Sequence, residues 1–344
     1  MRGLGLTRIL VVVAIVLAAS MPLDGVATAA EAGHYTIMMV LWRGCEDACR
    51  GFQDYIKSKG LPVEFLMRDV KQDPDAFPGI VAEARALKVD LVVTWGTTVT
   101  LGIVGAYDHV DPRTNLTDIP VLFMIVTDPL QTRVVANLDK PGHNVSGTLF
   151  LVPEDVQLRA IRSYFPFKKI GTVYNTNEVN AVISVDKIRA AATKEGVEVI
   201  SRAVPNGADG QPLADSLPGL IDELVKQGVD LIYFGSSSFI LLQRDVFTNA
   251  ALKLHIPVAV AGEVAVVDSN ALLGLVSKYY DVGKLTGKQA EQILVDRKNP
   301  ADMPIEGLSR FSLIVNMDVA RRLELYPPMS LINIVDAVKV KQGR

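Results

Sequence analysis

Short polar side chains directly follow two apolar runs of the sequence. Gly96-Thr97-Thr98 follows the run DLVVTW, and Thr127-Asp128 follows the run IPVLFMIV. Backbone N–H groups at a helix start, together with two hydroxyl groups, suit a carboxylate or another anion, whereas the acid Asp128 suits a ligand amine. The alternatives are that Thr97 or Thr98 only caps a helix, and that Asp128 only caps the next turn.

Similar polar groups follow three further apolar runs. Asn175 follows KKIGTVY and Glu263 follows IPVAVAG, while Phe234 ends DLIYF and is soon followed by Ser236 and Ser237. Hydroxyl and amide groups at these points would hydrogen-bond a small ligand, and Glu263 would pair with a ligand cation. The alternatives are ordinary turn chemistry, because Gly, Ser and Asn are common in turns, and a Glu263 that simply faces water.

Aromatic side chains and one arginine complete the candidate ligand-binding set. Trp42 and Trp95 are the only tryptophans of the chain, and each ends an apolar run. Their broad faces would stack on a planar or hydrophobic ligand, or would instead cap the core of their own domain. Arg43 is a candidate partner for a carboxylate because guanidinium binds such groups bidentately; the alternative is a solvated loop charge. Of Tyr279 and Tyr280, we expect one to line the site and the other to pack against it.

Cys45 and Cys49 lie four residues apart at the start of a predicted helix. Full helical geometry would hold their Cβ atoms ~5–6 Å apart, whereas a disulfide needs roughly 3.5–4.5 Å. A bridge therefore requires Cys45 to precede the helix, which Gly44 permits, and an oxidising compartment favours it. We predict a disulfide, with two free thiols as the alternative and no metal site, because no histidine lies nearby.

The sequence contains no catalytic signature. It has no G-x-S-x-G, no H-E-x-x-H and no G-x-x-x-x-G-K-[ST] motif, so we predict no catalytic residues and no cofactor. The 344 residues carry 35 basic and 38 acidic side chains, a net charge of −3. This balance argues against a nucleic-acid partner, which needs a basic surface.

Residues 1–29 are predicted to be a signal peptide. Arg2 and Arg8 form a positive region, residues 9–19 form an apolar run, and Ala27-Thr28-Ala29 supplies a small-x-small cleavage signal. The apolar run is shorter than the ~20 residues that span a bilayer, although an uncleaved membrane anchor is the alternative. We therefore expect cleavage near Ala29 and a soluble periplasmic protein.

The remaining sequence alternates between strand-like and helix-like segments. Apolar runs bounded by turns alternate with amphipathic segments, which predicts parallel sheets with right-handed crossovers. The pattern restarts after a polar seam at residues 142–147, so we expect two lobes built alike, with a ligand cleft at the carboxyl ends of the strands. The predicted strands are 36–42, 62–67, 90–95, 119–126, 168–174, 197–203, 230–234, 256–261 and 311–315, and the predicted helices are 46–59, 77–87, 98–107, 179–195, 217–227, 239–254, 281–296 and 317–323. The C-terminal segments 281–296, 311–315 and 317–323 cannot form a domain alone, so the chain should cross between the lobes more than once.

Six stretches in the expected order resemble the exported substrate-binding proteins of ABC importers, in the subfamily that includes tryptophan- and other aromatic-amino-acid-binding members. They are residues 90–100, 119–147, 168–181, 229–240, 256–263 and 279–306. The resemblance implies a type I periplasmic-binding-protein fold: α/β, with two Rossmann-like lobes of parallel sheets flanked by helices and joined by three crossovers. The expected N-terminal lobe is 34–147 plus 276–303, and the expected C-terminal lobe is 148–275 plus 304–344.

The resemblance also implies where the ligand binds. The family's cleft positions fall on Gly96-Thr97-Thr98, Thr127-Asp128, Asn175, residues 234–238 and Glu263. This chain has serines at 236–238 where many members carry an acid or an amide, which removes a partner for an α-ammonium group. It also has Trp95 where many members have a small residue.

The sequence therefore predicts a solute receptor and not an enzyme. It would capture a small organic ligand, an amino acid or related carboxylate with an aromatic body as one option, and deliver it as a monomer to the membrane permease of an ABC importer. One alternative is an exported sensor that docks on a signalling protein. Another is an exported α/β enzyme, which would need a base and a nucleophile converging on the cleft.

Overall fold

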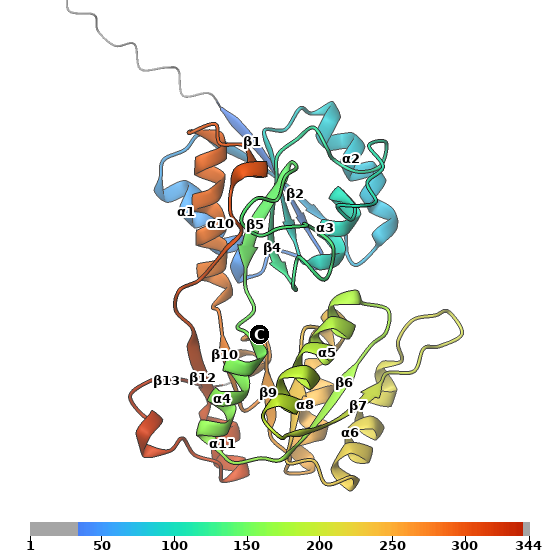
Figure 1. The fold of residues 1–344 in the computed structure, drawn as a ribbon, viewed down its shortest axis with the longest axis vertical. Helices are drawn as coiled ribbons and strands as arrows, with labels where there is room; N and C mark the ends of the chain where they lie inside the picture. The colour runs from blue at the N-terminus through green and yellow to red at the C-terminus, as the bar shows by residue number, and fades with distance from the viewer. Residues whose placement is uncertain (1–33, 340–344) are drawn as a thin grey trace, which may run out of the picture. The chain divides into compact units, whose positions relative to one another are not determined.

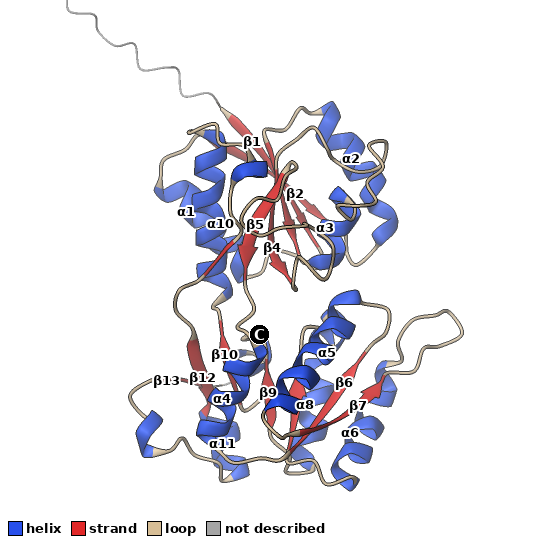
Figure 2. Ribbon diagram, viewed as in Figure 1, coloured by secondary structure: helices blue, strands red, loops and turns tan. Residues whose placement is uncertain are grey.

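The computed structural model describes residues 34–339, whose strands form two β-sheets covered by helices (Figure 1, Figure 2). The predicted signal peptide, residues 1–29, lies outside these described residues. Between residues 34 and 339, no helix combines the length and the apolar character that a membrane crossing requires.

The first lobe is built on a parallel sheet that helices cover on both faces. Its strands are β1 (Tyr35–Leu41), β2 (Val63–Asp69), β3 (Leu91–Trp95), β4 (Val121–Val126), β5 (Val145–Leu149) and β11 (Glu306–Gly307), and its helices are α1 (Asp47–Ser58), α2 (Phe77–Ala86), α3 (Thr97–Val104) and α10 (Tyr279–Leu294), with short 3-10 turns at Pro74–Ala76 and Pro300–Asp302. The strand order is β11-β5-β4-β3-β1-β2, and all neighbouring pairs are parallel.

The continuous apolar run of β1 follows from burial on both of its faces. Met38 and Val40 pack with α2 and α3, whereas Ile37 and Met39 pack with α1 and α10. Figure 1 shows these two helix pairs on opposite sides of the sheet. Because successive strand residues point to opposite faces, a strand covered on both sides turns neither set of side chains toward water, which favours apolar residues throughout.

The second lobe repeats this plan with a mixed sheet. Its strands are β6 (Lys169–Tyr174), β7 (Glu198–Ala203), β8 (Leu231–Phe234), β9 (Val258–Val260), β10 (Leu273–Val276), β12 (Ser312–Asn316) and β13 (Val335–Val338), and its helices are α4 (Glu154–Tyr164), α5 (Val179–Lys194), α6 (Leu217–Lys226), α7 (Ser238–Leu242), α8 (Arg244–Lys253), α9 (Val264–Val267) and α11 (Met317–Leu323), with 3-10 turns at Ala214–Ser216 and Met329–Leu331. The order is β13-β12-β10-β9-β8-β6-β7. The order β2-β1-β3-β4-β5 in one lobe matches β7-β6-β8-β9-β10 in the other, which confirms two lobes built alike.

The chain passes between the two sheets three times. Each passage lies between an element of one lobe and the next element of the other, at residues 150–153, 277–278 and 308–311. These positions are a few residues later than the predicted boundaries after 147, 275 and 303. The last passage also explains a departure from the predicted all-parallel sheets. The chain returns to the second lobe from the side on which β10 ended, so β12 runs antiparallel to β10.

Helix α10 belongs to the first lobe although it follows ten strands of the chain. It packs closely along α1, and two glycines allow the approach: a Cβ atom on Gly283 would stand 1.9 Å from the carbonyl oxygen of Ala48, and one on Gly51 would stand 2.0 Å from that of Tyr280. No side chain fits at either point. The amphipathic segment predicted at 281–296 therefore packs back onto a lobe, as expected.

Two local predictions differ from the structure. The predicted helix 239–254 is two helices, α7 and α8, which meet at Gln243. The predicted seam at 142–147 contains the start of β5. Gly147 lies there because a Cβ atom would stand 2.4 Å from the carbonyl oxygen of Phe123 on β4. This glycine therefore allows close strand packing and does not mark a turn.

Candidate ligand-binding site

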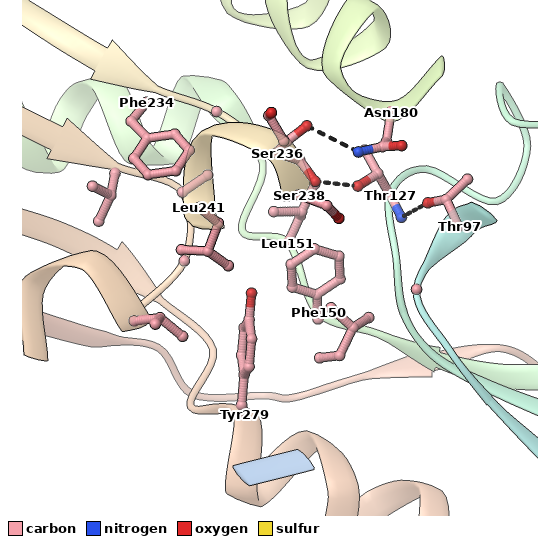
Figure 3. A pocket seen from close by; sticks show the side chains of 18 of the residues that line it. Thr97, Thr127, Phe150, Leu151, Asn180, Phe234, Ser236, Ser238, Leu241 and Tyr279 are labelled. Atoms are coloured by element: carbon pink, nitrogen blue, oxygen red, sulfur yellow. Dashed lines mark hydrogen bonds between the residues drawn. The ribbon is translucent and has the colours of Figure 1, made fainter. Parts of the chain in front are cut away.

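A pocket lies where the carboxyl ends of strands from both sheets meet (Figure 3). Nine of the predicted ligand-binding residues line it: Arg43, Trp95, Gly96, Thr97, Thr127, Phe234, Ser236, Ser237 and Tyr279. Five others do not: Trp42, Thr98, Asp128, Asn175 and Glu263.

Arg43 and Trp95 form one end of the pocket. Arg43 donates from Nε to Glu46 Oε1 at 2.7 Å and from Nη2 to Glu46 Oε2 at 3.2 Å, and its guanidinium carbon lies 4.4 Å from the centre of the Trp95 ring. Burial raises the pKa of Glu46, and Arg43 opposes that shift. Within residues 34–339, neither Arg43 Nη1 nor Trp95 Nε1 has a hydrogen-bond partner, and both atoms are buried. Two donors on pocket-lining side chains are therefore left without an acceptor among the described residues.

A short covalent ring holds the loop that carries Arg43. Cys45 and Cys49 are joined by a disulfide, with their Cα atoms 5.3 Å apart. Cys45 precedes Glu46, the N-cap residue of α1, and so lies outside the helix, as the predicted bridge requires. Gly44 takes φ +86°, a conformation that favours glycine. The loop between β1 and α1 is thereby tied to the helix.

The turn between β3 and α3 is joined to the end of β4. Gly96 is the N-cap residue of α3, and no side chain caps this helix, so the alternative that Thr97 or Thr98 caps it is wrong. Thr97 Oγ1 instead accepts a hydrogen bond from the backbone N–H of Thr127 at 3.1 Å. Thr98 is half-buried outside the pocket.

Hydrogen bonds to Glu178 hold the serine turn, residues 236–238 after β8. This carboxylate accepts hydrogen bonds from the backbone N–H of Ser238 and of Phe239, both at 2.7 Å. It also accepts from the side-chain amides of Asn175 at 3.2 Å and Asn180 at 3.0 Å. The strand-end pattern does not reveal Glu178, which lies three residues after Asn175 in the strand-to-helix turn before α5.

Asn175 supports the same turn and does not reach the pocket. Its Oδ1 accepts a hydrogen bond from Ser237 Oγ at 2.8 Å, and Ser237 Oγ accepts from the N–H of Ile240 at 3.0 Å. Asn175 therefore has the role in the turn that the alternative describes, whereas Ser237 both supports the turn and lines the pocket. Asn180, which the sequence analysis also missed, lines the pocket and donates to the carbonyl oxygen of Ser236 at 3.1 Å.

A hydrogen bond links the two lobes across the pocket. Thr127 Oγ1, after β4, lies 2.6 Å from Ser236 Oγ, after β8 (Figure 3). Two aromatic side chains form another wall: Phe150, in the first inter-lobe passage, and Tyr279, the first residue of α10, meet edge to face with ring centres 5.8 Å apart. Burial raises the pKa of Tyr279, so its hydroxyl stays protonated. The pocket thus combines hydroxyl groups with an apolar aromatic wall.

The remaining predicted residues have partners in the protein. Trp42 packs on the first lobe's core, so its core alternative is confirmed. Asp128 Oδ1 accepts from the N–H of Gln131 at 3.1 Å, which confirms turn capping. Glu263 does not line the pocket, and its Oε1 accepts from the N–H of Tyr279 at 2.6 Å. Tyr280 donates to Asp54 Oδ2 at 3.0 Å, away from the pocket.

No metal centre accompanies this site in the part of the chain that the structure describes. There, no three His, Cys, Asp or Glu side chains come together in a way that could hold an ion. The chemistry that the lining offers is hydrogen bonding, one guanidinium charge and apolar contact.

Comparison with known proteins places the chain in a family. Residues 37–339 match the family described as ABC transporter substrate binding protein. A tyrosine-binding protein of Clostridioides difficile strain R20291 is 32% identical to this chain over 285 residues, which cover 81% of this chain and 77% of that protein.

Two solved structures share the fold over most of the chain. The ligand-free, open structure of a substrate binding protein with adhesive properties from Clostridium difficile is 25% identical, with a TM-score of 0.68 over 89% of this chain and 100% of that one. An ABC domain in complex with L-Trp from Streptococcus pneumonia is 24% identical, with a TM-score of 0.76 and the same coverage; this second likeness shows the fold alone. The predicted type I periplasmic-binding-protein fold is confirmed. The family is one of binding proteins and not of enzymes, and this chain belongs to it: it is a substrate-binding protein of an ABC transporter.

Proposed function

We propose that this protein binds an amino acid or a related carboxylate with an apolar or aromatic body, and that Arg43 holds the carboxylate. One observation carries the proposal: Arg43 Nη1 and Trp95 Nε1 are buried at the pocket without partners in the described residues. A buried donor left unpaired costs about 1–3 kcal/mol. A ligand carboxylate supplies the missing acceptor, and a charge-assisted bond to guanidinium is stronger than a neutral one.

The position of Arg43 makes it a pre-organised binding group. Its side chain is only 8% exposed, Glu46 holds two of its nitrogens, and the Trp95 ring lies against its plane. Little conformational entropy is then lost when a ligand binds. The backbone N–H groups that begin α3, next to Trp95, add positive potential at the same end of the pocket.

The body of the ligand would occupy the apolar part of the pocket. Phe150, Phe234, Leu241 and Tyr279 line this part, and such surfaces favour an aromatic or branched side chain. The tyrosine-binding relative, 32% identical, supports a ligand of this kind.

We also propose how the protein works with its partners. The three passages between the sheets would act as hinges, so that closure buries the ligand and the closed form delivers it, as a monomer, to the membrane permease of an ABC importer. The family supports the association with a transporter. The proposed location is the periplasm, after cleavage near Ala29; mass spectrometry of the exported protein would measure its first residue, and light scattering its oligomeric state.

Calorimetry with purified protein tests the binding role of Arg43. Any co-purified ligand is first removed by unfolding and refolding, and a panel of aromatic and branched amino acids and carboxylates is then titrated. We expect Arg43→Met, made together with Glu46→Gln to avoid an unpaired buried acid, to weaken binding by about tenfold to a hundredfold.

The matched control is Arg68→Met with Glu83→Gln. Arg68 donates to both Glu83 oxygens in the first lobe, outside the pocket, so this change removes an equivalent pair without touching the site. Equal affinity of the Arg43 variant and the wild-type protein would refute the assignment.

A further inference from the structure

The charge of the pocket lining has one sign. Among the described residues that line the pocket, Arg43 is the only charged side chain, and no acid is present. The polar groups around it are hydroxyls, the Asn180 amide and the Trp95 N–H. A ligand carboxylate therefore meets a fixed cation, whereas a ligand ammonium meets no fixed anion.

Each acid near the pocket already has partners within the protein. Glu46 receives two hydrogen bonds from Arg43. Asp128 Oδ2 lies 3.0 Å from Lys187 Nζ. Glu178 receives four hydrogen bonds that hold the serine turn and the two asparagines. Turning any of these carboxylates toward a ligand would break contacts that shape the site.

Glu263 lies between two lining residues, because Gly262 and Val264 both line the pocket. Its Oε1 accepts from the N–H of Tyr279 at 2.6 Å, at the start of α10. Burial raises the pKa of Glu263 to about 7, with Asp47 and Asp281 raising it and Lys278 lowering it. Turning this oxygen toward a ligand would break the contact to the first residue of α10.

A second guanidinium acts at the same end of the cleft. The field of Arg244, on α8 of the second lobe, reaches Glu46 and lowers its pKa against the effect of burial. Arg244 Nε is buried and has no partner within residues 34–339, while the nearby Asp47 pairs with Arg50. Arg43 and Arg244 thus both lower the pKa of Glu46.

We propose that the preferred ligand is a monoanionic carboxylic acid with an aromatic or branched body and without an α-ammonium group. This inference rests on the proposed function and narrows its ligand class. An ammonium group that enters this lining loses its water shell beside Arg43 and finds hydroxyls but no charge partner. Burying a cation without an anionic partner is costly. The pocket should therefore discriminate against the zwitterion of the same size and shape.

Matched ligand pairs test the proposal by calorimetry on the refolded, ligand-free protein. The pairs are L-tryptophan with indole-3-propionate, L-tyrosine with 3-(4-hydroxyphenyl)propionate, and L-phenylalanine with 3-phenylpropionate; each pair differs only in the ammonium group. Tryptamine carries the ammonium without the carboxylate. We expect at least one acid to bind about tenfold more tightly than its amino acid, a difference of ~1.4 kcal/mol, and tryptamine not to bind.

The outcomes separate this inference from the function on which it rests. If every amino acid that binds does so as tightly as its des-amino partner or more tightly, the inference is wrong and the proposed function stands. If neither member of any pair binds, both are wrong. Glu263→Gln is the second variant, because glutamine keeps the acceptor for the Tyr279 N–H. We expect this variant to preserve the preference for the acid; a selective loss of amino-acid binding would make Glu263 the ammonium partner and overturn the proposal.

Discussion

Lys187 Nζ lies 3.0 Å from Asp128 Oδ2, an ion pair that joins α5 of the second lobe to the end of β4 in the first. Lys187 also lies 3.4 Å from Glu154 Oε2, and Glu154 is almost fully buried within the second lobe. The residue before Asp128, Thr127, makes its own inter-lobe hydrogen bond to Ser236. This short segment therefore holds the two lobes together beside the pocket.

Loss of this pair should speed ligand release. Asp128→Asn keeps the Lys187–Glu154 contact and removes only the inter-lobe charge. For a partly exposed pair we expect a loss of about 0.5–1 kcal/mol, hence a dissociation rate about two- to fivefold faster with little change in the association rate. Stopped-flow fluorescence with a bound ligand measures both rates. Asp118→Asn, which breaks the Arg85–Asp118 pair inside the first lobe, is the control and should leave release unchanged.

Glu263 should make stability depend on pH. Burial raises its pKa from 4.5 to about 7, so between these pH values the folded protein keeps a proton that the unfolded chain has lost. The contribution of this group is therefore full below pH 4.5 and is lost as the pH rises to about 7, with a slope of up to ~1.4 kcal/mol per pH unit. Urea unfolding across this range measures the effect. Glu263→Gln should flatten the curve; an unchanged slope in the variant would contradict the assignment.

The disulfide should contribute to both stability and binding. The bridge closes a ring of only a few residues, for which the chain-entropy relation gives about 2 kcal/mol. Because the ring lies next to Arg43, reduction or the change of both Cys45 and Cys49 to serine should lower the melting temperature and weaken carboxylate binding. Calorimetry with and without a reductant measures both effects. Undiminished affinity in the reduced protein would show that Arg43 is held by Glu46 and Trp95 alone.

Glu178 should position the serine turn without touching the ligand. Glu178→Gln places an amide N–H against at least one of four donors, which costs about 1–3 kcal/mol of stability. We expect a lower melting temperature and weaker binding, with the order of ligand preference retained because the lining side chains are unchanged. Glu223→Gln, which affects a largely exposed pair with Arg202, is the control. A variant with altered ligand preference would instead place Glu178 in direct contact with the ligand.

Local patterns in the sequence were enough to predict most elements of the fold. The run DLVVTW became β3, and the amphipathic segment at 281–296 became α10, because apolar periodicity reports which faces of an element are covered. The strand β5 was missed because its sequence, VSGTL, carries a serine, a glycine and a threonine. These small side chains are buried there because β4 and α10 approach closely: Gly147 packs on Phe123, and Thr148 Oγ1 hydrogen-bonds to Gln289 at 3.1 Å.

The sequence by itself determined the alternation of strands and helices, the repeat of two lobes and the gathering of polar residues at strand ends, since each of these follows from local burial and turn chemistry. Only the tertiary structure decided which polar groups line the pocket and which are hydrogen-bonded to other residues of the protein. Asn175 and Ser237 look alike as strand-end residues, yet their hydrogen bond to each other joins positions 62 residues apart. The free donors of Arg43 and Trp95 likewise depend on which partners the rest of the chain brings near. A side chain is available to a ligand only where folding leaves it without a partner, and that depends on contacts distant in sequence.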